Sequence, residues 1–405
     1  MQLGLLTVVA AATTYSRFIL SPLQEAVRLS MRLSDNQIAV LQGPAMALPL
    51  ALGVLPLGIA VDRYSRQCLL VLFVGLCIAG NLITALTSSF ALLCLARGLI
   101  GLAVPATAIT VLSMLADLYP PEARGRALMV TAIGQVAGMS IAFALGGNLL
   151  GRWDSEPTPW RWTLLALTAP LVLVMVLMWV VREPARTGVS VASPRTRGVI
   201  RELWAHRAPV LSLLAGGSLV AMVDTAVEIW ATPTFSRTFE LPPDRIGALM
   251  ATSFLVSGIV GPVAGGTLSD RCLRTGGPKR AITALSILAL LSVPASLFSV
   301  VTGVTMASLL LAAFVTMGSA ISVMTAALYT VVVPNELRGL CMGISSVVAV
   351  PLSLGLAPLA VSGLSGAIGG PGQIGVALTI VCMLISVLGA VAFRVGKQYL
   401  SSAAL

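Results

Sequence analysis

Charged residues are scarce in this sequence of 405 residues. Asp, Glu, Lys and Arg together make up 10% of the chain, whereas soluble globular proteins carry about 25%. Hydrophobic residues make up 57%. Such a chain has too few polar side chains to cover a folded surface, so the composition excludes an ordinary soluble protein and predicts a membrane protein.

The sequence also lacks the residues that most metal and cofactor sites require. Its only histidine is His206, which we interpret as a solvated loop residue. The six cysteines have no paired spacing for metal or redox chemistry, and a Gly-x-x-x-x-Gly-Lys-Ser/Thr loop for nucleotide phosphates is missing. We therefore expect no enzyme activity, no metal and no cofactor, and ATP-driven transport by this chain alone is excluded.

Apolar runs of about 20 residues, the length of a helix that crosses a bilayer, follow one another along the chain. Strand-length alternation is missing, so a membrane barrel is not predicted. The runs cover residues 2–23, 37–60, 68–88, 91–116, 127–150, 161–181, 208–233, 245–269, 280–301, 303–333, 338–362 and 374–394. The predicted fold is an all-α membrane protein with twelve transmembrane helices.

The two halves of the chain resemble each other. Residues 58–63 share Gly, Asp and Arg with residues 266–271 at an offset of 208 positions, and several apolar positions match in the same register, which indicates a duplication. We predict an N-terminal six-helix bundle over 1–181, a linker over 182–207 and a C-terminal six-helix bundle over 208–405, related by pseudo-symmetry.

Lys and Arg concentrate in one alternating set of loops and in the linker, and loops of this kind stay in the cytoplasm. The opposite loops carry fewer arginines, several with acids nearby. Both termini are therefore expected in the cytoplasm. The net charge of +10 follows this topology and forms no continuous basic stripe, so nucleic acid is not an expected partner.

The loop after the second predicted span carries a recognisable pattern. Residues 58–66 read Gly-x-x-x-Asp-Arg-x-x-Arg and resemble the signature loop of the major facilitator superfamily, and Asp270-Arg271 resembles its weaker second copy. Ser65 and Gln67 depart from the usual glycine and basic residue. The resemblance implies two six-helix bundles that work by alternating access.

A weaker resemblance concerns one branch of that superfamily. Residues 15–18 (Tyr-Ser-Arg-Phe) and 33–37 (Leu-Ser-Asp-Asn-Gln) are similar to the spinster-like lipid carriers, which implies a lipid-like cargo. Those carriers have acids where this chain has Ser16 and Val104. The difference puts proton antiport by that route in doubt and directs attention to the seventh span.

Charges at the cytoplasmic helix ends form a candidate gate. The family resemblance implies that Asp62, Arg66 and Asp117 form charge-assisted hydrogen bonds that hold the halves together when the cytoplasmic side is shut. The alternative is a set of solvated charges that only follow the topology. The candidate gate residues are Asp62, Arg63, Arg66, Asp117, Arg124, Asp270 and Arg271.

Four charged residues lie inside predicted spans, where an ionised side chain costs about 2.5–3.5 kcal/mol. They are Arg17, Arg97, Asp224 and Glu228. The helical rise places all four in the outer half of the membrane, and Asp224 and Glu228, four residues apart, share one helix face. The duplication offset aligns Asp224 with Ser16, so an Arg17–Asp224 contact across a central cavity is expected.

Three interpretations of these four residues stay open: a structural ion pair or outer gate, a proton-coupling site in which Asp224 or Glu228 titrates, and an anchor for a charged substrate. Gln135 and Asn148 are weaker polar candidates, whose side chains could equally form packing hydrogen bonds.

The predicted function is secondary active transport of a small molecule, with export of an amphipathic or lipid-like compound favoured. The alternatives are uptake of a small organic anion, suggested by the two buried arginines, and a non-transporting scaffold or receptor of the same fold. Expected partners are the substrate, the lipid bilayer and protons as coupling ion, and the protein is expected to be a monomer. Short loops suggest a bacterial inner membrane.

Overall fold

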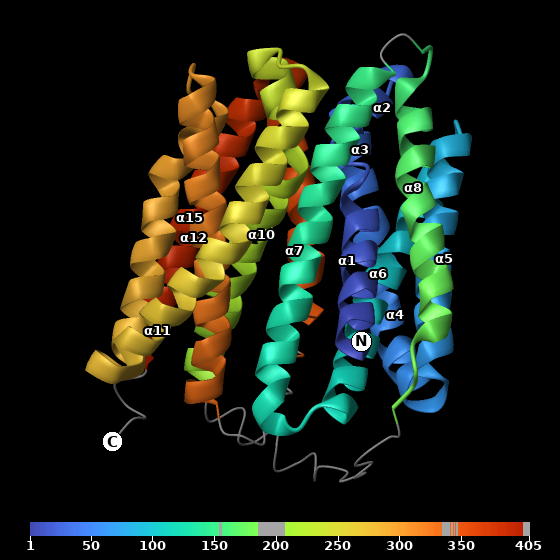
Figure 1. Cartoon of the computed structure of the whole chain (residues 1–405). Coiled ribbons are helices and arrows are strands. Elements are labelled where there is room, and N and C mark those ends of the chain that lie inside the picture. The colour runs from blue at the N-terminus through green and yellow to red at the C-terminus, as the bar shows by residue number, and fades with distance from the viewer. Residues whose placement is uncertain are drawn as a thin grey trace. The chain divides into compact units, whose positions relative to one another are not determined.

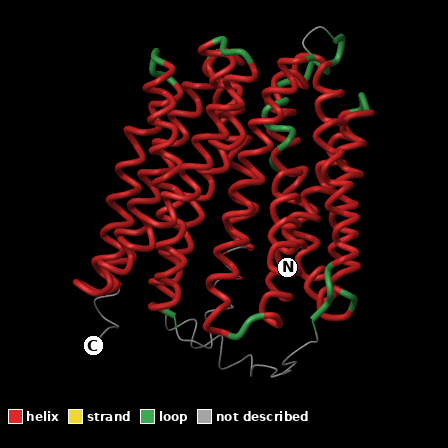
Figure 2. Tube along the Cα trace, in the orientation of Figure 1, coloured by secondary structure: helices red, strands yellow, loops and turns green. Residues whose placement is uncertain are grey.

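The computed structural model describes residues 1–153, 156–184, 207–333, 341, 343, 345 and 347–399. All regular structure in this part of the chain is helical, as the sequence predicts (Figure 2). The α-helices of the first half are α1 (Gln2–Phe18), α2 (Gln24–Ser30), α3 (Asp35–Gln42), α4 (Pro44–Arg63), α5 (Arg66–Leu86), α6 (Phe90–Leu118), α7 (Pro121–Arg152) and α8 (Pro159–Leu177) (Figure 1). Those of the second half are α10 (Arg207–Phe239), α11 (Pro243–Ala295), α12 (Val304–Val332), α14 (Ala357–Ile368) and α15 (Ile374–Tyr399). Short 3₁₀ and π turns extend some of them at Met178–Val180, Ser296–Ser299, Pro351–Leu356 and Pro371–Gln373.

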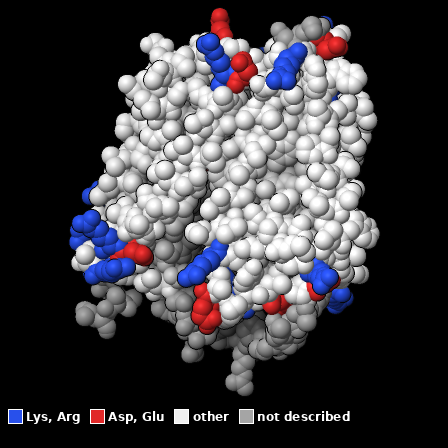
Figure 3. All heavy atoms as spheres, viewed as in Figure 1, with Lys and Arg blue, Asp and Glu red and all other residues white. Residues whose placement is uncertain are grey.

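Each of the twelve predicted spans overlaps a described helix. Nine of the described helices are long and apolar enough to cross a membrane, or ten if the bent pair Asp35–Gly53 and Pro56–Arg63 counts as one span. The number of such membrane-crossing helices is below twelve partly because α11 runs through two predicted spans. It has a break between them at Gly277 (φ 62°, ψ −163°). α1 has 17 residues, one short of the length required. On the face in Figure 3, charged side chains gather near the helix ends.

Two compact units divide the chain. Unit 1 comprises Met1–Val189 and Thr232–Leu255, and unit 2 comprises Ser190–Ala231 and Val256–Leu405. The last turns of α10 and the first turns of α11 thus belong to unit 1, whereas the predicted boundaries place these residues in the C-terminal bundle. The boundaries 1–181, 182–207 and 208–405 themselves stay predictions.

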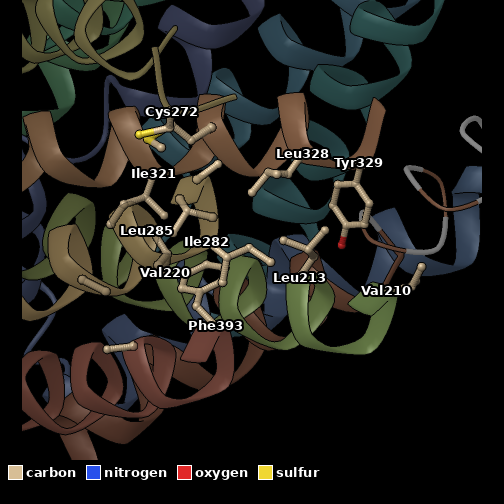
Figure 4. Packing of buried hydrophobic residues seen from close by; sticks show 14 of the residues in the cluster. Val210, Leu213, Val220, Cys272, Ile282, Leu285, Ile321, Leu328, Tyr329 and Phe393 are labelled. Atoms are coloured by element: carbon tan, nitrogen blue, oxygen red, sulfur yellow. The ribbon is translucent and has the colours of Figure 1, made fainter. Parts of the chain in front are cut away.

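Each unit has its own apolar core. In unit 1, buried residues of α1, α5 and α6 pack together, among them Leu6, Leu70 and Met114. In unit 2, Val220 and Phe393 belong to a cluster drawn from α10, α11, α12 and α15 (Figure 4). These cores fix the helices that carry the buried polar residues described below.

Glycines allow close helix contacts inside unit 1. A Cβ at Gly138 of α7 would lie 2.9 Å from the carbonyl carbon of Ala11 on α1 and closer still to its oxygen. A Cβ at Gly147 would lie 2.8 Å from the Cα of Gly247 on α11, and one at Gly247 would lie 2.9 Å from the Cα of Gly147. These contacts let α1 approach α7 closely, and they bring segment 232–255 against α7.

Candidate functional site

Arg97 of α6 is buried in the interior of unit 1, with 1% of its surface exposed. Its Nη2 donates to Gln42 Oε1 at 2.6 Å and to the Arg17 carbonyl oxygen at 3.2 Å. Its Nε, also buried, has no hydrogen-bond partner in the described part of the chain. Nη2 also lies 3.1 Å from Met46 Sδ. The described partners of this guanidinium are thus all neutral, and its unpaired N–H can still donate to an anion.

Two glutamines continue the polar network from Arg97. Gln42 Nε2 donates to Gln24 Oε1 at 2.9 Å, and both glutamines are buried. Among the described residues, Gln24 Nε2 has no partner. The Gln24–Gln42–Arg97 network therefore contains two buried donors that can still bind an acceptor. Neither glutamine was predicted as a site residue: Gln42 interrupts an apolar run, and Gln24 directly follows one.

Arg17 and Ser16 of α1 lie next to this network. The Arg17 guanidinium lies over the Phe18 ring, 4.7 Å from its centroid, and the Ser16 hydroxyl accepts a hydrogen bond from Asn81 Nδ2 at 2.8 Å. The expected Arg17–Asp224 contact joins residues of different units, and it stays a prediction.

Asp224 of α10 faces a small cavity inside unit 2. Its carboxylate lies against Gly318 of α12, where a Cβ would come within 2.8 Å of the carboxylate carbon. Ser292 and Ser386 also line this cavity of about 10 Å³, which is room for roughly one water molecule. Glu228 follows one turn later on α10 and is partly buried, so α10 places two carboxylates on one face.

The weaker candidates on α7 have different surroundings. Gln135 is partly buried, whereas Asn148 is exposed. Asn148 lines an open pocket of about 360 Å³ together with Arg152 and Asp244. The structure does not connect either side chain to Arg97 through a described hydrogen bond.

Arg66 forms the centre of an ion network at the end of unit 1 that is predicted to face the cytoplasm. Its side chain is 2% exposed. Nη1 donates to Asp117 Oδ2 at 2.5 Å and to Ser113 Oγ at 3.1 Å, and Nη2 donates to the Pro184 carbonyl oxygen at 3.1 Å. The structure thus brings together two of the three residues of the expected relay, Arg66 and Asp117.

Glu183 is the acid that sequence reasoning missed. Its Oε1 accepts from the Arg66 backbone N–H at 3.1 Å and from Arg66 Nε at 3.4 Å, and its Oε2 accepts from Ser65 Oγ at 2.7 Å. Burial alone would raise the pKa of Glu183, but the hydrogen bonds from Ser65 and Arg66 and the charge of Arg66 outweigh burial and lower it. Glu183 therefore ties the first residues after α8 to the loop between α4 and α5.

The other gate candidates contribute less to this network. Asp62 and Arg63 are exposed, as are Asp270 and Arg271 in unit 2, and no hydrogen bond joins Asp62 to Arg66 or Asp117 among the described residues. Arg124 donates to the Ala116 and Tyr119 carbonyl oxygens at 2.7 and 3.0 Å, so it caps the end of α6. A gating role for these residues stays a prediction.

Four charged residues form an outer ion cluster in unit 1, at the helix ends predicted to face outside. Arg237 of α10 donates to Glu25 Oε2 at 2.8 and 3.1 Å, and to the two Asp35 carboxylate oxygens at 2.8 and 2.9 Å. Arg28 donates to Glu25 Oε1 at 2.6 Å. Two arginines and two acids thus neutralise one another, and they hold the end of α10 against α2 and α3.

The pKa of Glu25 is shifted in the direction that favours its ionised form within the outer ion cluster. Burial alone would raise the pKa of Glu25, but the hydrogen bonds and charges of Arg28 and Arg237 lower it. A carboxyl with a lowered pKa contributes stability that is present above its ordinary pKa and is lost as the pH falls through the lowered value. The cluster is therefore intact at neutral pH.

Comparisons with known proteins agree on one family. The family model described as Major Facilitator Superfamily matches residues 6–358. A putative metabolite transport protein of Bacillus subtilis (strain 168) is 28% identical over 145 residues, 36% of this chain and 31% of that protein. Protein spinster homolog 1 of Xenopus tropicalis is 22% identical over 279 residues, 64% of this chain and 52% of that protein. The chain therefore matches about a third to a half of the length of these relatives.

Solved structures share the fold over nearly the whole chain. A bacterial homolog of the human lysosomal transporter Spinster, in an inward-facing and unoccupied conformation, superposes with a TM-score of 0.82 at 20% identity, covering 98% of this chain and 95% of that one. A D-xylose-proton symporter superposes with a TM-score of 0.75 at 14% identity, covering 96% of each chain. At such identities these likenesses show the fold alone.

Proposed function

Because this chain belongs to the major facilitator superfamily, we propose that it is a secondary transporter that exports an amphipathic compound with an anionic head group by alternating access. The family match confirms the resemblance seen in residues 58–66. Together with the long apolar helices, it identifies a multi-pass integral membrane protein, and transport of a small molecule is part of the proposal. Cytoplasmic termini and a bacterial inner membrane are part of the proposal.

The unpaired Nε–H of Arg97 carries the proposal. A buried guanidinium without a carboxylate among its described hydrogen-bond partners is costly unless an anion completes its shell. The network lies among apolar helices, which suits a solute with an apolar tail. The spinster-like resemblance favours a lipid-like tail, and the outward direction is carried over from it.

A small organic anion without a tail is the second candidate cargo, because the same N–H would bind its carboxylate. The names of the relatives do not decide between the two candidate cargoes, since the relatives include metabolite, D-xylose and glucose transporters. Asp224 is the proposed proton-coupling residue, because its carboxylate faces a water-sized cavity inside the bundle.

Ligand binding in lipid nanodiscs tests the cargo class. We expect dodecyl phosphate to raise the Tm of the wild-type protein more than succinate or xylose does, since a ligand at 100 times its Kd adds about 2.7 kcal/mol of stability. Arg97→Ala should lose this shift, and Arg274→Ala, which alters an exposed arginine, should keep it. An equal response to dodecyl phosphate in Arg97→Ala would contradict the proposed anchor. A response to succinate alone would favour the second candidate.

A further inference from the structure

We propose that α2 and α3 couple the outer ion cluster to the buried Arg97 network, so that an anion bound at Arg97 loosens segment 232–255 from the rest of unit 1. This coupling rests on the proposed function, because it takes Arg97 as the anchor of the solute. It adds a route by which binding inside the bundle reaches the outer helix ends.

α3 contacts the outer ion cluster at its first residue and the buried Arg97 network at its last residue. Its first residue, Asp35, accepts from Arg237 at 2.8 and 2.9 Å, and its last residue, Gln42, accepts from Arg97 at 2.6 Å. Seven helical steps separate the two residues by about 10 Å. α3 therefore spans the distance between the outer ion cluster and the buried network.

α2 makes the same connection with neighbouring residues. Gln24 accepts from Gln42 at 2.9 Å in the buried network, and Glu25, the next residue, accepts from Arg237 at 2.8 Å in the outer ion cluster. A shift of α2 that moves one of these side chains must move the other. Both short helices therefore connect the same two sites.

The turn between α2 and α3 holds them as one body. Leu33 N–H donates to the Arg28 carbonyl oxygen at 2.9 Å, and Arg32 has a φ of 52°, which gives the turn a defined shape. A capping box between Ser34 and Gln37 fixes the start of α3. At the other end, Gly43 has a non-helical backbone (φ −113°, ψ −96°) and separates α3 from α4, so we take it as the hinge of the α2–α3 pair.

Competition between the anion and Gln42 for Arg97 drives the release of the α2–α3 pair. A guanidinium binds a phosphate or carboxylate through two adjacent N–H groups, so an anion at the unpaired Nε–H of Arg97 would also reach Nη2. Hydrogen bonds to an anion are stronger than those to a neutral amide oxygen, and the anion would therefore displace Gln42 Oε1 from Nη2. The anion binds better when Gln42 has withdrawn, and this difference in affinity shifts the equilibrium. With its inner anchor lost, the α2–α3 pair can carry Glu25 and Asp35 away from Arg237.

Hydrogen exchange measured by mass spectrometry on the full chain in nanodiscs tests this coupling without a transport assay. We expect Gln42→Leu to speed exchange of the slowest amides in residues 232–255 by about tenfold, as Arg237→Gln should. Gln42→Glu, which gives Arg97 a carboxylate, should slow the same amides. Thr168→Val, which removes a buried hydroxyl that donates to the Leu164 carbonyl oxygen within α8, is the control and should leave them unchanged.

Adding dodecyl phosphate extends the test. In the wild-type protein the probe should speed exchange in 232–255, and in Gln42→Leu it should add nothing. The coupling is overturned if both Gln42 variants change exchange only around Arg97 and leave 232–255 at the wild-type rate. If the probe does not bind but the Gln42 variants behave as expected, the proposed cargo is wrong and the coupling stands.

Discussion

Replacing Arg66 with alanine is expected to destabilise the protein by about 3–5 kcal/mol, the usual result of removing one partner from a buried ion pair. The side chain is 2% exposed and hydrogen-bonds Asp117, Glu183, Ser113 and the Pro184 carbonyl oxygen. Without it, Asp117 and Glu183 would lose the cation that compensates their charge. We expect a lower Tm in detergent and loss of transport in proteoliposomes.

Arg126→Ala provides the control for Arg66→Ala. Arg126 lies at the same predicted cytoplasmic end but is exposed, so its loss should change stability by no more than about 0.5 kcal/mol. A Tm for Arg66→Ala equal to that of Arg126→Ala would show that the network around Arg66 is only a set of solvated charges.

The substitution Gly147→Val is expected to prevent segment 232–255 from packing closely against α7. A Cβ there would lie 2.8 Å from the Cα of Gly247 and closer still to the Pro243 carbonyl oxygen, and neither backbone atom can rotate away. Overpacking of this kind costs about 1–3 kcal/mol, which shifts a two-state equilibrium by about 5- to 150-fold. Transport should fall accordingly, and amides of residues 243–250 should exchange faster.

Gly151→Val controls for the effect of a β-branched residue in α7. The nearest atom to a Cβ at Gly151 is Asp244 Cβ at 3.9 Å, an ordinary contact, so this variant should transport at close to the wild-type rate. If Gly147→Val does the same, the contact between Gly147 and Gly247 has no part in the transport cycle.

Local patterns in the sequence were sufficient to predict the family and the fold class. Apolar runs identified the helices, since membrane spans need about 20 residues whatever their neighbours. The segment 58–66 identified the family because its charges are rare in so apolar a chain. The position of Arg97 within an apolar run predicted its burial, since no loop could expose it.

Contacts between distant segments could not be predicted in the same way. Glu183 meets Arg66 across 117 positions and Arg237 meets Glu25 across 212, and no periodicity or spacing connects them. The acids beside the outer arginines were visible in the sequence, but only the packing of α2, α3 and α10 assembles four of these charges into one cluster. Gln24 and Gln42 were not predicted because a neutral amide in or beside an apolar run gives a weaker signal than a charge.

Transport in proteoliposomes made with the purified protein tests the central claim most directly. With dodecyl phosphate as the probe and an imposed pH gradient, we predict gradient-dependent movement of the probe by the wild-type protein, none by Arg97→Ala, and loss of the pH dependence in Asp224→Asn. A wild-type protein that moves neither this probe nor succinate under any gradient, although it binds one of them in nanodiscs, would contradict the account and identify a receptor or scaffold with a transporter fold.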